Sequence, residues 1–229
     1  MGKINNKISI IIRTRNEERF IGHAIQSILD KIHKPEIIIL DNDSNDQTLQ
    51  IVRLFTQDKK LKNNTNINYT DIKVIGIKDY TPGKSLNLGV KMAKNKDVMI
   101  MSAHCELKKI DLNKHLNDLK KYICIFGNQI PSYMGKKITK RYIWQNFKEV
   151  RVENMYSKSE KRFFLHNAIA IYKKNILKKI PFNENLQGKE DRYWINEMMK
   201  NKKNKFLYDP SLEVVHHYTP NGNTWKGIG

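Results

Sequence analysis

The chain has 229 residues, and 39% of them are hydrophobic, which suits one large domain or two small ones. Recurring apolar runs exclude wholesale disorder, and the longest runs are far shorter than the roughly 20 residues of a transmembrane helix. The 42 Lys and Arg residues outnumber the 23 Asp and Glu residues, and the formal net charge of +19 indicates a surface that attracts phosphate groups.

Charge alone leaves the phosphate-bearing partner open. Nucleic acid, anionic lipid and a nucleotide all fit a basic surface, and so does a plain excess of solvated lysines. The first apolar run is too short for a signal peptide, and Cys105 and Cys124 do not make a disulfide framework. These features together predict a protein of the reducing cytoplasm.

Strand and helix patterns alternate along the first half of the chain. Short apolar runs rich in β-branched residues predict buried strands, and apolar residues spaced three and four apart predict helices. The predicted strands are 8–12, 36–40, 71–77 and 97–102. The predicted helices are 20–29, 47–55 and 83–94, with a loop at 56–70. This alternation predicts an α/β fold with a parallel sheet and right-handed crossovers.

Polar segments follow three of the predicted strands, at 13–17, 41–46 and 102–106. Ligands bind at the carboxyl ends of the strands in sheets of this kind. We therefore expect the three segments to converge on one binding edge.

The second half of the chain has weaker patterns. It holds predicted strands at 123–127 and within 163–172, a basic stretch with aromatic residues at 136–156, a predicted helix at 191–200, and strand-like pieces at 206–208 and 212–215. No internal repeat or low-complexity linker marks a domain boundary.

Five short motifs occur in a fixed order along the chain. They are SIIIRTRNE at 9–17, IIILDNDSNDQT at 37–48, GKSLNLG at 83–89, PFNE at 181–184 with GKED at 188–191, and the pair His216-His217. In this order they resemble the motifs of the inverting family 2 glycosyltransferases. The resemblance covers the chain from Ile8 to about Tyr218.

The resemblance implies a GT-A fold, in which a Rossmann-like nucleotide-binding half with a mostly parallel central sheet adjoins a smaller acceptor-side half. We expect a single domain over residues 1–229, with 1–106 as the nucleotide-sugar-binding half and 107–229 as the acceptor-side half. Residues 225–229 carry no helix or cap pattern, which favours a chain that continues beyond them.

The resemblance also implies which residues bind the donor, expected to be a UDP or GDP sugar. Asp41 matches the aspartate that contacts the nucleobase, and Asp43 is a second candidate acceptor for the nucleotide. Arg13, Arg15 and Lys84 are suited to neutralise or stack on the nucleotide. The full donor-binding set is Arg13, Thr14, Arg15, Glu17, Asp41, Asp43, Lys84, Asn87 and Ser102. For Asp43, Ser44 and Asp46, the alternative role is a turn with a helix N-cap.

Glu190 and Asp191 form the predicted catalytic pair. In the resembling enzymes the second carboxylate is the general base, so the resemblance implies that Asp191 takes the acceptor proton. The acceptor oxygen then attacks the anomeric carbon opposite the leaving phosphate, and this single displacement inverts the configuration. Both acids also suit the first turn of a helix, and the two roles are compatible.

The family usually carries Asp-x-Asp at the end of the fourth strand, where it holds Mg²⁺ or Mn²⁺ against the diphosphate. This chain has Ser-Ala-His at 102–104. One interpretation makes His104 the ligand of a divalent cation, with Glu106 or His217 completing a site that favours Mn²⁺. A second has His104 and the basic donor-site residues stabilise the diphosphate without a metal, and a third is an inactive site. His216 and His217 point to opposite faces of a strand, and the resemblance favours His217 for the site.

The leading hypothesis is a cytoplasmic glycosyltransferase of bacterial surface-polysaccharide assembly, such as capsule or lipooligosaccharide, acting on a glycan or lipid-linked glycan. The basic and aromatic stretch 136–162 suits peripheral docking to the anionic inner face of the membrane. The alternatives are an inactive GT-A scaffold and a basic nucleic-acid-binding protein. No nucleic-acid-binding motif is recognisable, and the carboxylates around Asp41 and Asp191 repel phosphate backbones, so no nucleic acid partner is expected.

Overall fold

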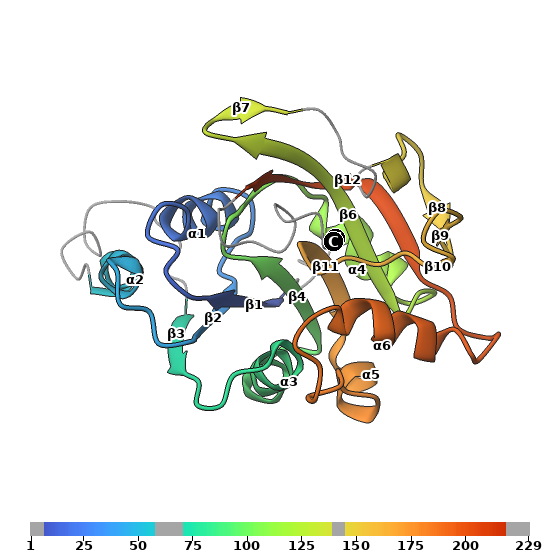
Figure 1. Ribbon diagram of the computed structural model, residues 1–229, viewed down its shortest axis with the longest axis horizontal. Helices are drawn as coiled ribbons and strands as arrows, with labels where there is room; N and C mark the ends of the chain where they lie inside the picture. Colours follow the sequence, from blue (N-terminus) through green and yellow to red (C-terminus); the bar gives the residue numbers. More distant parts are fainter. Residues whose placement is uncertain (1–6, 58–70, 139–144, 219–229) are drawn as a thin grey trace, which may run out of the picture.

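The computed structural model describes residues 7–57, 71–138 and 145–218. Its strands are β1 (Ser9–Thr14), β2 (Glu36–Asp41), β3 (Asp71–Gly76), β4 (Asp97–Ser102), β5 (Cys105–Lys109), β6 (Cys124–Tyr133), β7 (Lys136–Lys137), β8 (Val152–Glu153), β9 (Tyr156–Ser157), β10 (Arg162–Phe163), β11 (Ile169–Lys173) and β12 (Leu207–His217). Its helices are α1 (Ile21–Leu29), α2 (Thr48–Gln57), α3 (Pro82–Met92), α4 (Leu112–Asp118), α5 (Lys174–Lys179) and α6 (Glu190–Met198). They form a mixed α/β fold around one large sheet, which confirms the predicted fold class (Figure 1).

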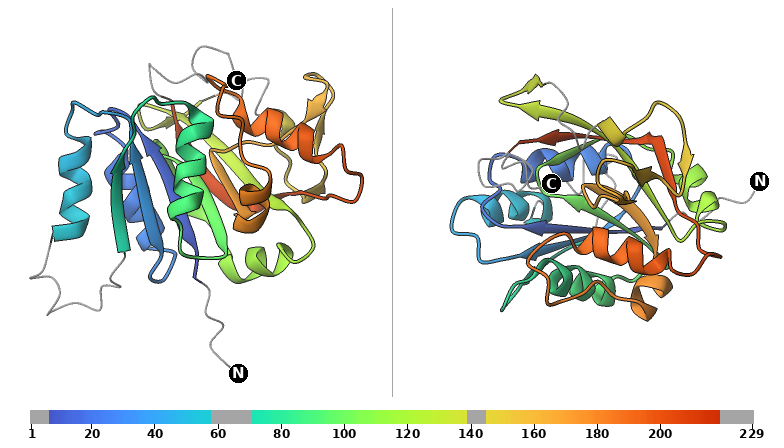
Figure 2. Two further views of the ribbon diagram at one scale, coloured as in Figure 1. Left: turned by 90° about the horizontal axis from the view of Figure 1, so that it is seen from below. Right: turned by 45° about the vertical axis from the view of Figure 1, so that its right-hand side comes forward.

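Within the described residues, the sheet has the strand order β3-β2-β1-β4-β11-β6-β12-β5. The first four strands of this order are parallel to one another, and they stand side by side in the left panel of Figure 2. Their register places Thr14 opposite Asp41 and Arg13 opposite Ser102. The carboxyl ends of β1, β2 and β4 therefore meet at one edge, as the sequence predicts.

The rest of the sheet is mixed. β11 is antiparallel to both β4 and β6, whereas β12 is parallel to β6 and antiparallel to β5. The register between β12 and β6 shifts between Asp209 and Glu213, where an irregularity accommodates Pro210. The carboxyl end of β12, with His216, reaches β5 and thereby the loop that follows β4.

Several predictions for the second half were wrong in extent. The strand-like pieces 206–208 and 212–215 are one strand, β12, and the apolar stretch 163–172 holds only the end of β10 and most of β11. The prediction also lacked β5, α4 and α5. Of the basic stretch 136–156, the described parts contain β7, β8 and the start of β9, while 139–144 lie outside the described residues. Most of the predicted loop 56–70 lies outside them as well.

Alternate side chains of the central strands enter two separate cores. Ile11 and Ile38 pack in the core with residues of α3, α5 and α6, whereas Ile10 and Ile37 pack in the core with residues of α1, α2 and α4. Figure 1 shows α1 and α3 on opposite faces of the parallel strands. Because both faces of β1, β2 and β4 are covered, the interiors of these strands are apolar and do not alternate.

Local sequence fixes the helix starts that border the site. Thr81 caps α3 by accepting a hydrogen bond from the Lys84 amide (3.1 Å), and Pro82 occupies the first turn. A Cβ atom on Gly83 would lie 2.3 Å from the carbonyl oxygen of Asn183, so only glycine allows α3 to pack this closely on the 181–184 motif. No helix within the described ranges is long and apolar enough to cross a membrane.

Candidate functional site

A cavity of about 300 Å³ opens at the carboxyl edge of the parallel strands. It lies among the ends of β1 and β4 and the segments that follow them. Its lining consists of Arg13, Thr14, Arg15, Glu17, Asn42, Tyr80, Ile100, Met101, Ser102, Ala103, His104 and Asn167. Six of the residues predicted for the site are among them, namely Arg13, Thr14, Arg15, Glu17, Ser102 and His104.

Arg13 links this cavity to the start of α6. Its guanidinium forms a 3.1 Å ion pair with Glu190, whose side chain is buried. Burial disfavours the charged form, but Glu190 and other nearby groups outweigh it and raise the pKa of Arg13. The other terminal nitrogen, Nη1, is buried without a hydrogen-bond partner. Arg13 is therefore a cavity-lining cation that is fixed by Glu190 and keeps one buried N–H group without a protein partner.

Neither Glu190 nor Asp191 lines the cavity, but Asp191, which is only 8% exposed, contacts a residue that does. Its Oδ2 accepts a hydrogen bond from the backbone amide of Asn167 (3.0 Å), and its Oδ1 accepts one from the amide of Arg192 (2.8 Å). Asn167 itself lines the cavity. Two amides thus fix the orientation of a carboxylate that retains further lone pairs for a substrate hydroxyl.

His104 belongs to a chain of hydrogen-bonded side chains. Its Nδ1 lies 2.9 Å from Oε1 of Glu17, and its Nε2 lies 3.1 Å from Nε2 of His216. Nδ1 of His216 lies 2.6 Å from Oε1 of Gln129. Burial lowers the pKa of His216, and the neighbouring histidines lower it further. Both ring nitrogens of His104 are therefore engaged by protein side chains.

The histidine pair of β12 splits across two faces of the strand, as predicted. His216 turns to His104 at the cavity, whereas His217 contacts Glu106 (2.7 Å) and stacks on Phe20 with ring centroids 4.7 Å apart. The late histidine that reaches the cavity residues is thus His216, and the resemblance had favoured His217.

The proposed metal ligands are not gathered at one point. Glu106 pairs with His217, and His104 pairs with Glu17 and His216. Across residues 7–57, 71–138 and 145–218, no three His, Cys, Asp or Glu side chains are arranged to hold a metal ion. The described side chains in this arrangement do not fit a divalent cation.

The 41–46 segment is a turn that closes on the segment after β1. Both carboxylate oxygens of Asp41 accept hydrogen bonds from Ser44, at 3.1 Å from its amide and 2.6 Å from its hydroxyl. Ser44 and Asp46 in turn accept the amide protons of Asn16 and Glu18. Asp43 is exposed and has a positive φ of 54°. Neither Asp41 nor Asp43 lines the cavity, although Asn42 between them does.

Lys84 and Asn87 also lie off the cavity lining. Lys84 is 3.8 Å from Asp79 in a solvent-exposed pair. The amide of Asn87 donates to the carbonyl of Phe182 (2.9 Å) and accepts from its N–H (3.0 Å). Asn87 therefore fastens α3 to the segment that leads into the Glu190-Asp191 pair.

Sequence reasoning assigned no site role to Asn42, Tyr80, Gln129, Asn167 or His216. Asn42 lies inside a motif and Asn167 follows a histidine, which are weak signals. Gln129 and Tyr80 carry none, because only the tertiary arrangement brings them to this edge.

A family model described as glycosyl transferase family 2 matches residues 9–181. The chain is 26% identical over 196 residues to the GalNAc(5)-diNAcBac-PP-undecaprenol beta-1,3-glucosyltransferase of Campylobacter jejuni, covering 83% of this chain and 59% of the relative. It is 27% identical over 192 residues to the poly(ribitol-phosphate) beta-N-acetylglucosaminyltransferase TarS of Staphylococcus aureus, covering 81% of this chain and 31% of TarS. The chain thus spans less than two thirds of either relative.

The fold matches solved structures of similar proteins. TarS residues 1–349 in complex with UDP-GlcNAc superpose with a TM-score of 0.69 at 21% identity, over 94% of this chain and 60% of that one. A mannosyltransferase of Pyrobaculum calidifontis in complex with GDP-Man and Mn²⁺ gives a TM-score of 0.65 at 16% identity, over 96% of this chain and 59% of that one. At these identities the likeness shows a shared fold. Together with the family match over residues 9–181, it shows that this chain belongs to glycosyl transferase family 2.

Proposed function

We propose that the protein transfers a sugar from a nucleotide-sugar donor to a hydroxyl of a glycan or lipid-linked glycan, with inversion at the anomeric carbon. The observation that carries the proposal is the oriented Asp191 carboxylate, held by Asn167 beside a cavity that is also lined by Arg13. Family membership supports sugar transfer. Structural neighbours with UDP-GlcNAc and GDP-Man support a UDP or GDP sugar as donor.

In this proposal the donor diphosphate lies against Arg13. Its Nη1 group has no protein partner, and the hydroxyl of Thr14 is likewise buried and unpaired. Arg13 and Thr14 both line the cavity at the edge where the strand ends meet. A charge-assisted hydrogen bond from Arg13 offsets negative charge on the departing nucleoside diphosphate. The nucleobase lies towards the Asp41 turn, where Asn42 reaches the cavity.

Asp191 is the proposed general base. As the acceptor oxygen approaches, Asp191 takes the hydroxyl proton, the new bond from that oxygen to the anomeric carbon forms, and the bond from this carbon to the phosphate oxygen breaks. The electron pair leaves on the nucleoside diphosphate. Attack opposite the leaving group inverts the configuration. A base positioned in this way contributes about 10²–10⁴-fold to the rate.

In this proposal, side chains of the protein, and not a metal ion, offset the negative charge on the leaving nucleoside diphosphate. The described residues form no cluster fit for Mn²⁺ or Mg²⁺. Arg13, which is cationic at any physiological pH, lines the cavity, and His104 lies on its wall. Of the three interpretations of the Ser-Ala-His segment at 102–104, this is the one in which the diphosphate is stabilised without a metal.

The proposed acceptor is a lipid-linked glycan, and the proposed location is the cytoplasmic face of the membrane. The Campylobacter relative is named for a lipid-linked acceptor, which supports a peripheral position at the cytoplasmic membrane face. In the 136–162 stretch, Arg151 forms ion pairs with Asp118 and Asp209, and Arg162 forms an ion pair with Glu160. Exposed residues such as Lys136, Lys137 and Lys158 are left to contact anionic lipid. Absence of binding to anionic vesicles at low salt would contradict the membrane part.

Thermal unfolding with UDP, GDP, TDP and CMP tests the donor assignment. Saturation at a hundredfold excess over the Kd adds about 3 kcal/mol to the free energy of unfolding. We expect a shift with UDP or GDP, and turnover of the corresponding nucleotide sugar once an acceptor glycan is present. Anomeric analysis of the product by NMR then checks inversion. Nucleotide binding without any turnover or donor hydrolysis would favour the inactive scaffold, and no shift at all would contradict the donor site.

A further inference from the structure

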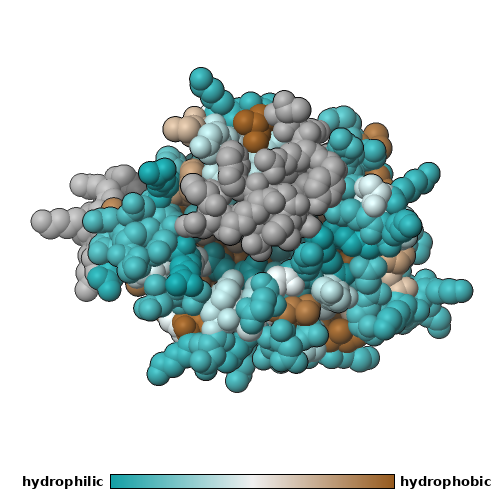
Figure 3. Space-filling view, in the orientation of Figure 1, coloured by the Kyte–Doolittle hydropathy of each residue, from teal (hydrophilic) through white to brown (hydrophobic). Residues whose placement is uncertain are grey.

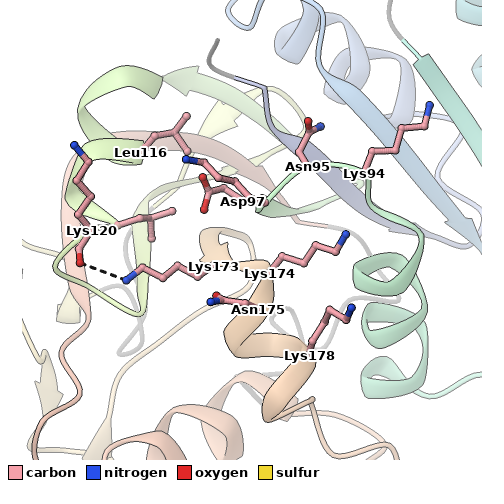
Figure 4. A pocket seen from close by; sticks show the side chains of 11 residues that line it. Lys94, Asn95, Asp97, Leu116, Lys120, Lys173, Lys174, Asn175 and Lys178 are labelled. Atoms are coloured by element: carbon pink, nitrogen blue, oxygen red, sulfur yellow. Dashed lines mark hydrogen bonds between the residues drawn. The ribbon is translucent and has the colours of Figure 1, made fainter. Parts of the chain in front are cut away.

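A second, larger cavity lies at the opposite edge of the sheet from the proposed donor site. It has a volume of about 490 Å³ and opens where β4 begins and β11 ends, between α4 and α5 (Figure 4). Asp97 and Lys173 lie opposite each other in the register of these two strands. The length of β4, from Asp97 to Ser102, separates the two cavities, a span of about 17 Å at 3.3 Å per residue.

Lysines dominate the wall of this cavity. Three of them are committed to the protein: Lys94 pairs with Asp71, Lys173 bonds the carbonyl of Lys120, and Lys174 bonds the carbonyl of Ala93. The other three lysines are exposed and form no ion pair with any described residue. They are Lys96, Lys120 and Lys178. Ammonium groups without protein partners around a concave surface favour an anionic ligand.

Asp97 adds an independent observation. Its side chain is only 6% exposed, its carboxylate faces the cavity in Figure 4, and no described residue hydrogen-bonds to it. Burial raises the pKa of Asp97 more than the charges of Lys96 and Lys173 lower it. A buried carboxyl without a partner is costly, and a ligand hydroxyl would satisfy it.

We infer that this cavity binds the phosphate ester of a polyol or sugar, with the positive charge of the free lysines favouring the phosphate and Asp97 accepting a hydrogen bond from a ligand hydroxyl. Phosphate alone would leave Asp97 unsatisfied, and an uncharged polyol would leave the lysines without an anion. The volume is in the range of small-ligand sites. The same chemistry occurs in a soluble sugar phosphate and in a phosphatidylglycerol headgroup. The site is separate from the proposed donor site and does not depend on the proposed function.

Titrations with sn-glycerol 3-phosphate, inorganic phosphate and glycerol test the inference, followed by amide NMR shifts of residues 94–97 and 173–178. We expect glycerol phosphate to bind at least fivefold tighter than phosphate, and glycerol not to bind. Lys96→Gln with Lys178→Gln should weaken glycerol phosphate binding at least fivefold. The control pair Lys202→Gln with Lys203→Gln, exposed lysines elsewhere with the same charge loss, should leave it unchanged. Asp97→Asn should reduce the preference for glycerol phosphate over phosphate.

Vesicles distinguish the two sources of the ligand. Capture by phosphatidylglycerol vesicles that is lost in the Lys96/Lys178 variant and kept in the control assigns the headgroup. Binding of soluble glycerol phosphate without such capture assigns a soluble sugar phosphate. Equal loss in both lysine variants, equal affinity for phosphate and glycerol phosphate, or no localised shifts would each overturn the inference, because the lysines would then be an ordinary solvated surface.

Discussion

Arg13, at the end of β1, and Glu190, at the start of α6, form an ion pair of 3.1 Å. The first and fourth sequence motifs therefore meet in one contact, which joins the parallel strands to the helix that carries Asp191. Figure 3, drawn in the orientation of Figure 1, shows a mostly hydrophilic surface with small separate apolar groups. In the proposed function, binding at this edge depends on polar groups placed by the strand ends, with Arg13 prominent among them.

Glu190→Gln should lower the free energy of unfolding by about 2 kcal/mol, because it leaves the charge of Arg13 without its buried partner. Urea denaturation measures this. Glu197→Gln on the same helix removes only a solvent-exposed pair with Lys200 and should cost under about 0.5 kcal/mol. Equal effects of the two substitutions would contradict a structural role for the Arg13–Glu190 pair.

Gly83→Ala should destabilise the protein by about 1–3 kcal/mol, because the new Cβ would lie 2.3 Å from the backbone oxygen of Asn183 and force α3 away from the 181–184 segment. Gly76→Ala in β3 is the matched control, since nothing lies within 4 Å of its Cβ position. Thermal unfolding of both variants checks the difference. If Gly83→Ala unfolded like Gly76→Ala, the close packing described for α3 would be incorrect.

Asp209 should contribute to stability at neutral pH and lose that contribution in acid. Burial raises the pKa of this carboxyl, but hydrogen bonds and ion pairs from His115, Ser211 and Lys114 outweigh it and hold the pKa below its usual value. Its unfolded-state pKa is about 3.9, so the stabilisation is present above that pH and is lost as the pH falls below it. Asp209→Asn should cost about 2 kcal/mol at pH 7.

The control for that prediction is Asp43→Asn, an exposed turn position that asparagine tolerates. Urea unfolding at pH 7 and pH 3 compares the two variants with the unchanged protein. The deficit of Asp209→Asn should shrink at pH 3. A deficit that is the same at both pH values would show that charge on Asp209 does not stabilise the fold.

Removal of divalent cations should leave nucleotide binding in place. The described residues hold no cluster of three metal-ligating side chains, and Arg13 supplies a positive charge at the cavity. The apparent Kd for the nucleotide should change less than about twofold between EDTA and Mn²⁺, a difference under about 0.4 kcal/mol. Loss of binding in EDTA with recovery in Mn²⁺ would contradict this account of the leaving-group charge.

Strands β1, β2 and β4 could be predicted because they are buried on both faces and therefore consist mainly of apolar residues, as in 8–12 and 36–40. The sequence did not predict β5, because this strand is short and ends in two exposed lysines, so it lacks an apolar run. α4 and α5 are each under two full turns, so packing against the strands stabilises them more than their own sequence does.

Some residues of the candidate site could likewise be predicted from the sequence, and others could not. Arg13, Ser102 and His104 lie at the end of predicted strands or within two residues after it, so strand direction alone places them at one edge. His216 meets both His104 and Gln129 only because β12 runs beside both β5 and β6. That pairing joins distant parts of the chain and leaves no local pattern. Strand alternation predicts that only one of His216 and His217 faces the site. It does not predict which one, and the tertiary structure shows that it is His216.

The most direct test of the account is Asp191→Asn, with transfer and nucleotide binding measured on the same preparation. The amide keeps the size of the side chain and removes the base, so turnover should fall by about 10²–10⁴-fold while the Kd for the nucleotide stays within about twofold. Glu197→Gln on the same helix should keep full turnover. An Asp191→Asn enzyme that transfers sugar at the unchanged rate would contradict the assignment of Asp191 as the base.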